Sequence, residues 1–356
     1  MTDHVVADAA EPPARVDQEH ERTAPELDRK APAGRRRTLA MGCWVALFVA
    51  AVLSWGLPTD PVYAFLWLWA LAVAWRFGRP WREHLAFARD WVPVVLLLTL
   101  YNLSRGFADN IRTPHVTEMI DADRWMFGWM TGGEVPTVWL QQRLYVPDDV
   151  QWWEALVSMV YLSHFVASLG TAIVLWLVAR HRWAQFMRRW FVLGLAGLAT
   201  YFVYPAAPPW WAAVNGYLDH SVPRLSLRGG QELGMHGAFS IVKLGQAAAN
   251  PVAAMPSLHT AYALMVVLFF ALMVRKRWWP LLALYPLAMT FTLVYSGEHY
   301  VIDVLVGWAY VVFAFTVVWL GERWWRERRA RTAADGTPVR AEQREPSADG
   351  SVRTSV

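Results

Sequence analysis

The feature that most constrains this chain is a series of long apolar segments. Most of them approach the roughly 20 residues that a helix needs to cross about 30 Å of hydrocarbon. The chain is 56% hydrophobic and 17% charged, whereas about a quarter of a soluble domain is charged. The sequence therefore predicts an all-α, polytopic transmembrane helical bundle of about eight spans. The segments lie at roughly 39–57, 61–77, 91–107, 152–179, 188–204, 256–274, 278–295 and 299–320.

Lysine and arginine gather in alternate connections between these segments. Connections rich in these residues stay on the cytoplasmic side of a membrane. The pattern predicts an integral protein of the cell membrane with both termini cytoplasmic and loops 108–151 and 205–255 extracytoplasmic. The basic groups are Arg35–Arg37, Arg76–Arg89, Arg180–Arg189, Arg275–Arg277 and Arg323–Arg329.

Composition also divides the chain. Residues 1–38 and 323–356 are polar and predict disordered cytoplasmic tails. Residues 39–90 hold the first two predicted spans, and residues 91–322 hold the other six with their extracytoplasmic loops. Within loop 108–151, the stretches 121–130 and 136–145 mix charged with large apolar residues, which favours short helices lying along the membrane interface.

Three stretches interrupt the apolar pattern with residues that can do chemistry. The first, Tyr204–Trp211, ends the fifth segment with Pro205, Pro208 and Pro209. Prolines stop a helix and stiffen the chain that follows. We consider Pro208 a candidate substrate-binding residue, although a simple helix terminator explains the prolines as well.

The second stretch, Asn250–His259, opens the sixth segment. Pro256 suits the first turn of a helix, which would put His259 one turn inside. Free N–H groups and the dipole at such a start can bind an anion. His259 is a candidate catalytic residue and Ser257 a candidate substrate ligand. Alternatively, His259 caps its own helix or pairs with a loop.

The third stretch, Tyr295–Gly307, turns the seventh segment into the eighth. His299 and Asp303 are four residues apart and are predicted to share one helical face. A carboxylate there can hold one imidazole nitrogen and leave the other as base or nucleophile. Tyr300 is a candidate substrate contact, whereas Glu298 is expected to be solvated. A structural His–Asp pair is the alternative.

The predicted topology places all three stretches in the same leaflet, at the extracytoplasmic ends of their helices. This makes one shared site more probable than three separate ones. Arg105 falls at the outer end of the third segment. It could bind a phosphate with two hydrogen bonds, or it could snorkel to the interface.

Two of these stretches resemble a known family. Pro-Ser-Leu-His at 256–259 and Gly-Glu-His-Tyr-Val-Ile-Asp at 297–303 are similar to the second and third signatures of the type 2 phosphatidic acid phosphatase superfamily. The proline stretch at 205–211 and Asn-Pro-Val-Ala-Ala-Met at 250–255 look more like its inositol phosphorylceramide synthase branch. The resemblance covers about 100–320.

This resemblance implies a six-helix catalytic core within 91–322, with the two spans of 39–90 as accessory helices. It also implies a phosphoryl transfer in two steps, without metal or cofactor. By that likeness His299 would attack phosphorus and form a phosphohistidine, and Asp303 would orient it. His259 would protonate the leaving oxygen and then deprotonate the acceptor.

The sequence departs from the phosphatase pattern in its cations. The phosphatases carry an arginine six residues before the histidine, where this chain has Leu293, and their Lys-x6-Arg-Pro signature is absent. A less cationic pocket suits a singly charged phosphodiester. We therefore predict transfer of a phosphoinositol-like headgroup from a lipid phosphodiester to a hydroxyl acceptor. The candidate replacement cations are Arg105, Arg224, Arg228 and Lys243.

Three alternatives stay open at this point. A lipid or polyprenyl phosphate phosphatase would use the same residues. A metal hydrolase would use His259, His299 and Asp303 as zinc ligands. A lipid transporter or carrier-binding protein would use the His–Asp pair as a proton relay. The expected partners are membrane lipids, as donor and hydroxylated acceptor, and not nucleic acid. The sequence does not determine the oligomeric state.

Overall fold

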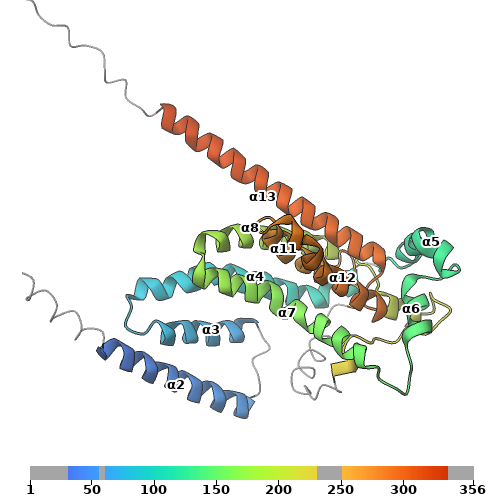
Figure 1. Cartoon of the computed structure of the whole chain (residues 1–356), viewed down its shortest axis with the longest axis horizontal. Helices are drawn as coiled ribbons and strands as arrows, with labels where there is room; N and C mark the ends of the chain where they lie inside the picture. Colours follow the sequence, from blue (N-terminus) through green and yellow to red (C-terminus); the bar gives the residue numbers. More distant parts are fainter. Residues whose placement is uncertain (1–30, 56–60, 112, 231–250, 336–356) are drawn as a thin grey trace, which may run out of the picture. The chain divides into compact units, whose positions relative to one another are not determined.

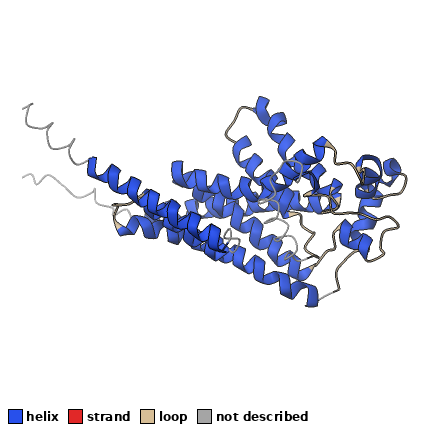
Figure 2. Cartoon of the chain, turned by 90° about the horizontal axis from the view of Figure 1, so that it is seen from below, coloured by secondary structure: helices blue, strands red, loops and turns tan. Residues whose placement is uncertain are grey.

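The computed structural model describes residues 31–55, 61–111, 113–230 and 251–335. Their regular secondary structure is helical, and the described segments add only two isolated β-bridges (Figure 2). The described residues up to Thr113 form one compact unit and those from Pro114 onward form a second. The all-helical architecture predicted from the sequence is confirmed.

The first unit contains three helices, α2 (Ala31–Trp55), α3 (Pro61–Trp75) and α4 (Trp81–Ile111). The helix α3 packs against both of the others. The indole of Trp67 on α3 meets the rings of Trp44 and Phe48 on α2 edge-on. These helices correspond to the first three apolar segments.

The second unit is a bundle arranged around one short apolar helix, α11. This helix packs against α7, α8, α12 and α13, and its apolar residues face several of these neighbours at once, as in a helix buried on most sides. The second unit holds five bundle helices, and α4 belongs to the first unit, so the six-helix core implied by the resemblance stays a prediction. The bounds are α7 (Trp152–Val178), α8 (Arg180–Val203), α11 (Leu258–Ala271), α12 (Trp279–Tyr295) and α13 (Val301–Asp335).

All eight predicted segments are helical, but fewer are clear membrane spans. Within the described residues, four helical stretches are long and apolar enough to cross a membrane, or five if the two halves of α7, bent by 46°, count as one span. At 14 residues, α11 is shorter than the roughly 20 that a full span needs. The helix α8 begins with Arg180, His181 and Arg182. The chain is an integral membrane protein, and length and composition do not fix eight spans.

The last helix extends past the predicted boundary at residue 322 and ends at Asp335. Its extension is rich in strong helix formers, and Arg323 pairs with Glu327 one turn later at 2.8 Å. Guanidinium groups of Arg328 and Arg329 lie over the rings of Trp324 and Trp325. At the other end, α2 begins at Ala31 rather than near 39. The predicted disorder of 1–30 and 336–356 concerns residues outside the described ones.

Short helices and loops gather at the end of the bundle where α13 begins (Figure 1). The two predicted loop helices are present as α5 (Thr117–Thr131) and α6 (Pro136–Leu144), and α9 (Pro209–Val214) follows the proline stretch. One hydrophobic cluster joins residues of these helices to Tyr300. Bridges between His115 and Ala206 and between Ala206 and Ala253 align three loop segments. This packed end carries the candidate site.

A glycine allows α13 to approach the start of α11. A Cβ atom at Gly307 would lie 2.6 Å from the carbonyl oxygen of Ser257. We expect Gly307→Ala to destabilise the protein by about 1–3 kcal/mol through overpacking, measured by thermal unfolding in detergent. In the same helix, Gly321 has no atom within 4 Å of its Cβ position. Gly321→Ala should be neutral or slightly stabilising, and equal effects of the two changes would contradict the close approach.

Candidate active site

The beginnings of α11 and α13 lie side by side and bring the two predicted histidines together. The Ser257 backbone N–H donates to the Asp303 carbonyl oxygen at 3.0 Å. His299 Nε2 lies 3.3 Å from His259 Nδ1, and His299 Nδ1 lies 3.5 Å from an Asp303 carboxylate oxygen. The His299 and Asp303 side chains are both buried. The structure thus brings these three residues together as predicted, although His259 lies forty residues before His299 along the chain.

Both helices begin later than the sequence predicted. The helix α11 starts at Leu258, so Pro256 precedes it, and α13 starts at Val301, so His299 lies in the preceding turn. The prediction that His299 and Asp303 share a helical face is therefore wrong. Instead Asp303 accepts the Tyr300 backbone N–H at 2.9 Å, as the third residue of a capping box does. This capped turn brings its carboxylate next to His299.

A residue of α5 fixes the start of α13. The two carboxylate oxygens of Asp123 accept the backbone N–H groups of Val301 and Ile302, each at 2.9 Å. These groups have no partner inside their own helix. Asp123 is completely buried, and burial raises its pKa to about 7 despite the two backbone bonds. Asp123 thus positions the turn that holds His299.

The expectation that Glu298 is solvated is wrong. Its side chain is 6% exposed and accepts two hydrogen bonds from Arg224, each 2.8 Å long, and one of 2.6 Å from Ser226. The left-handed Gly297, with φ of 77°, lets the chain turn back beneath this loop. The Leu225 N–H also donates to the Ser296 carbonyl oxygen.

Arg224 is a cation beside the histidines. It is close enough to His259 and to Tyr161 for their charges to interact. Burial alone would lower the pKa of Arg224, but the Glu298 carboxylate outweighs burial and raises it. The guanidinium therefore stays charged and held in place. Of the four candidate replacement cations, Arg224 is the one that the described structure brings to the site.

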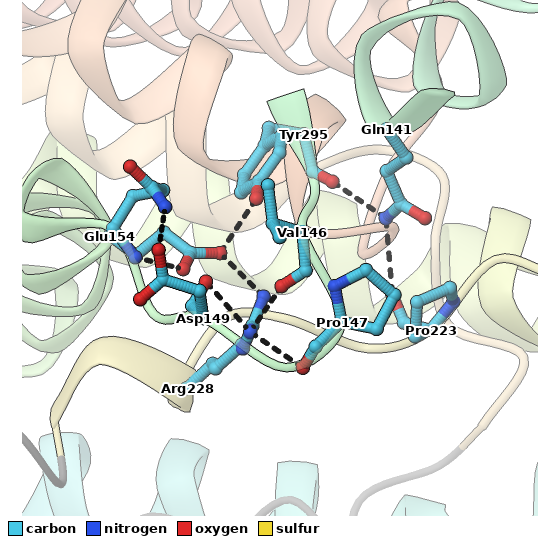
Figure 3. A network of polar contacts seen from close by, with 9 residues as sticks. Gln141, Val146, Pro147, Asp149, Glu154, Pro223, Arg228 and Tyr295 are labelled. Atoms are coloured by element: carbon cyan, nitrogen blue, oxygen red, sulfur yellow. Dashed lines mark hydrogen bonds and ion pairs between the residues drawn. The ribbon is translucent and has the colours of Figure 1, made fainter. Parts of the chain in front are cut away.

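Arg228 has a different role, shown in Figure 3. It lies 3.2 Å from the buried Glu154 of α7 and donates to three backbone carbonyls of the loop 146–149. Glu154 also accepts the Tyr295 hydroxyl at 2.7 Å. Arg228 thus ties the loop to the bundle, and its bonds leave it engaged away from the histidines. Arg105 and Lys243 lie outside the residues whose side chains are described.

A third histidine, His164 of α7, belongs to the same cluster. Its ring centroid lies 4.2 Å from that of His259, and Tyr161, three residues earlier on α7, stacks on His259 at 5.4 Å. Sequence reasoning missed both residues. The sequence did point to His164, because a histidine within a long apolar segment is functional more often than not.

The remaining predicted residues are buried around the site. Ser257 is the N-cap of α11 and Pro208 that of α9, and Tyr300 is enclosed in the hydrophobic cluster. The hydroxyls of Ser257 and Tyr300 have no hydrogen-bond partner within the described residues. Their contact with a substrate stays a prediction.

The fold and the site define a membrane-embedded helical protein with a His–His–Asp centre where the starts of two helices meet. A sequence profile of the PAP2 superfamily matches residues 136–317, which is just over half of the 356 residues and includes all three members of the centre. The chain belongs to the PAP2 superfamily, and the predicted resemblance is confirmed.

Two named proteins are similar to this chain. Phosphoinositol dihydroceramide synthase of Bacteroides thetaiotaomicron is 35% identical over 136 residues, which cover 36% of this chain and 43% of the relative. Inositol phosphorylceramide synthase catalytic subunit AUR1 of Saccharomyces cerevisiae is 25% identical over 291 residues, 78% of this chain and 68% of the relative. No solved structure matches. The chain thus aligns with less than half of the first relative and about two thirds of the second.

The raised pKa of Asp123 predicts a pH-dependent contribution to stability. Because its folded pKa, about 7, lies above the ordinary value of 3.8, this contribution is complete below the ordinary value and is lost as the pH rises through 7. We expect Asp123→Ala to cost roughly 2 kcal/mol more at pH 5 than at pH 8, measured by denaturation in detergent. If the cost of Asp123→Ala instead grew with pH, the two backbone hydrogen bonds would lower the pKa of Asp123 more than burial raises it. The exposed Asp121→Ala on the same helix is the control.

Proposed function

We propose that this protein is a lipid phosphotransferase that moves a phosphoinositol headgroup from a lipid phosphodiester to the hydroxyl of a ceramide-like acceptor. The contact of His299 with both His259 and Asp303 carries the proposal. The names of the two relatives, a phosphoinositol dihydroceramide synthase and the catalytic subunit of an inositol phosphorylceramide synthase, support the headgroup and the acceptor.

In the first step, His299 Nε2 attacks phosphorus. The bond from phosphorus to the diacylglycerol oxygen breaks, and protonated His259 gives its proton to that oxygen. Asp303 faces Nδ1 of His299, so it holds the imidazole and offsets the positive charge that forms on it. In-line attack places the leaving oxygen opposite His299 Nε2. The substrate phosphate must therefore enter between His299 Nε2 and His259 Nδ1, which lie 3.3 Å apart.

In the second step, His259 takes the proton of the acceptor hydroxyl. The acceptor oxygen attacks phosphorus, the phosphorus–nitrogen bond breaks, and free His299 is regenerated. Protons balance over the cycle, because His259 ends as it began. A water molecule in place of the acceptor would give hydrolysis, so the site has to exclude water while the intermediate lasts.

The pairing of Arg224 with Glu298 supports a phosphodiester substrate. Arg224 brings a positive charge to the histidines, and the buried Glu298 carboxylate largely balances it. A phosphomonoester approaches two negative charges, whereas a diester carries one. A pocket of small net charge therefore favours the diester.

We also propose the membrane topology predicted from the sequence. Eight spans with cytoplasmic termini would place the site at the extracytoplasmic membrane surface. There the diacylglycerol product and the acceptor could exchange with the bilayer, while the headgroup stays on the aqueous side.

The His–Asp centre makes a direct prediction. His299→Ala should abolish formation of the new phospholipid, and His259→Gln should slow it about 10²–10⁴-fold, the usual contribution of a general acid–base. The assay uses labelled phosphatidylinositol and ceramide with the purified protein, with and without a chelator. His181→Gln, an exposed histidine of α8, is the control. Full turnover by His299→Ala would contradict the mechanism.

The Arg224–Glu298 pair predicts a change of substrate preference. Glu298→Gln leaves the charge of Arg224 unbalanced, so hydrolysis of phosphatidic acid should gain relative to transfer from phosphatidylinositol. The ratio of the two rates measures this, and the exposed Glu118→Gln serves as control. An unchanged ratio in a folded Glu298→Gln protein would remove the electrostatic reason for preferring a diester.

A phosphatase acting on lipid or polyprenyl phosphates is the second candidate, favoured by membership of the PAP2 superfamily. It would release inorganic phosphate and form no new lipid in the same assay.

The metal hydrolase is a further alternative. No three His, Cys, Asp or Glu side chains in the described residues are grouped to hold one metal ion. Activity in the presence of the chelator tests that alternative directly.

A further inference from the structure

A cavity of about 520 Å³ lies between α9 and the loop that follows it. This volume is in the range of small-molecule sites. Its lining includes the indole of Trp210 and the polar side chains of Asp219, His220, Ser221 and Arg224. All of these residues lie within the second unit.

The cavity borders the catalytic turn at two points. The Trp210 backbone N–H donates to the Gly297 carbonyl oxygen at 3.1 Å. Arg224 is held by Glu298, the residue next to His299. A ligand whose phosphate lay at Arg224 and His299 could therefore extend from that phosphate into the cavity.

The lining mixes polar groups with apolar ones, which include Trp210, Leu218 and Val222. The polar groups and the flat indole together suit a polyol ring. Asp219 and Ser221 are exposed and offer a carboxylate and a hydroxyl, which are good partners for ligand hydroxyls. His220 lies 3.5 Å from Glu134, so its ring is oriented by a second polar group. The Trp210 ring gives one flat face, and the Arg224 guanidinium lies 5.1 Å from its centre. A cyclitol ring has hydroxyls around its edge and C–H groups on its faces, which fits such a lining.

We propose that this cavity binds the cyclitol part of the headgroup, with the phosphate directed to Arg224 and the histidines. The proposal rests on the proposed function and adds the site that holds the transferred group. During the reaction the headgroup would stay in the cavity, bonded through phosphorus to His299, while diacylglycerol leaves on the membrane side and the acceptor enters.

Binding to the purified full-length protein tests this without turnover. The probes are myo-inositol 1-phosphate, glycerol 3-phosphate and inorganic phosphate, titrated by calorimetry. We expect inositol phosphate to bind most tightly, and Asp219→Asn and Ser221→Ala to weaken it roughly tenfold, as loss of hydrogen bonds to a charged or polar partner does. Both variants change exposed side chains, and their unfolding temperatures should equal that of the parent. Asp121→Asn, the same change outside the cavity, should leave binding unchanged.

The outcomes separate this inference from the proposed function. Equal binding of all three probes, or unchanged binding by both variants, would overturn the inference, even if the protein transferred the headgroup of phosphatidylinositol. Tight binding of inositol phosphate that depends on Asp219 and Ser221 would support it, even if the parent protein released only inorganic phosphate from lipids. In that case the transferase proposal alone would fail.

Discussion

The beginnings of α11 and α13 touch through their backbones, and the chemistry of the site depends on that contact. The Ser257 N–H bond to the Asp303 carbonyl oxygen and the absence of a side chain at Gly307 set how closely the helices approach. With this spacing the His259 and His299 rings meet, although forty residues separate them along the chain. The positive ends of both helix dipoles also point to the same place, which favours an anion there.

Three buried acids surround the turn that carries His299, and each has a separate partner. Asp123 holds the first backbone N–H groups of α13, Asp303 holds the N–H of Tyr300 and faces His299, and Glu298 holds Arg224. Burying a charge is costly unless it is paired and hydrogen-bonded. The density of these pairs indicates that the position of the turn is fixed before substrate arrives, which is what a nucleophile that must meet phosphorus in line requires.

The sequence pattern predicted where helices form and which motifs share a site. The apolar segments became helices, the loop stretches at 121–130 and 136–145 became α5 and α6, and three separate motifs met at one site. The helices α11 and α13 begin two residues later than predicted: Ser257 takes the N-cap position of α11 after Pro256, and Asp303 accepts the Tyr300 N–H at the start of α13. The roles of Asp123, Glu298 and His164 could not be read from spacing, since each depends on packing between elements far apart in sequence. The number of spans also stays a prediction, because α11 is short and α8 begins with charged residues.

The covalent intermediate on His299 is the claim on which the account rests most heavily. Rapid quenching of the protein with phosphatidylinositol labelled in the inositol ring, without acceptor, followed by peptide mass spectrometry, measures it directly. The account predicts label on the peptide containing His299, with a mass increase of one phosphoinositol group. A labelled peptide containing His259 instead, or an adduct of phosphate without the ring, would contradict it.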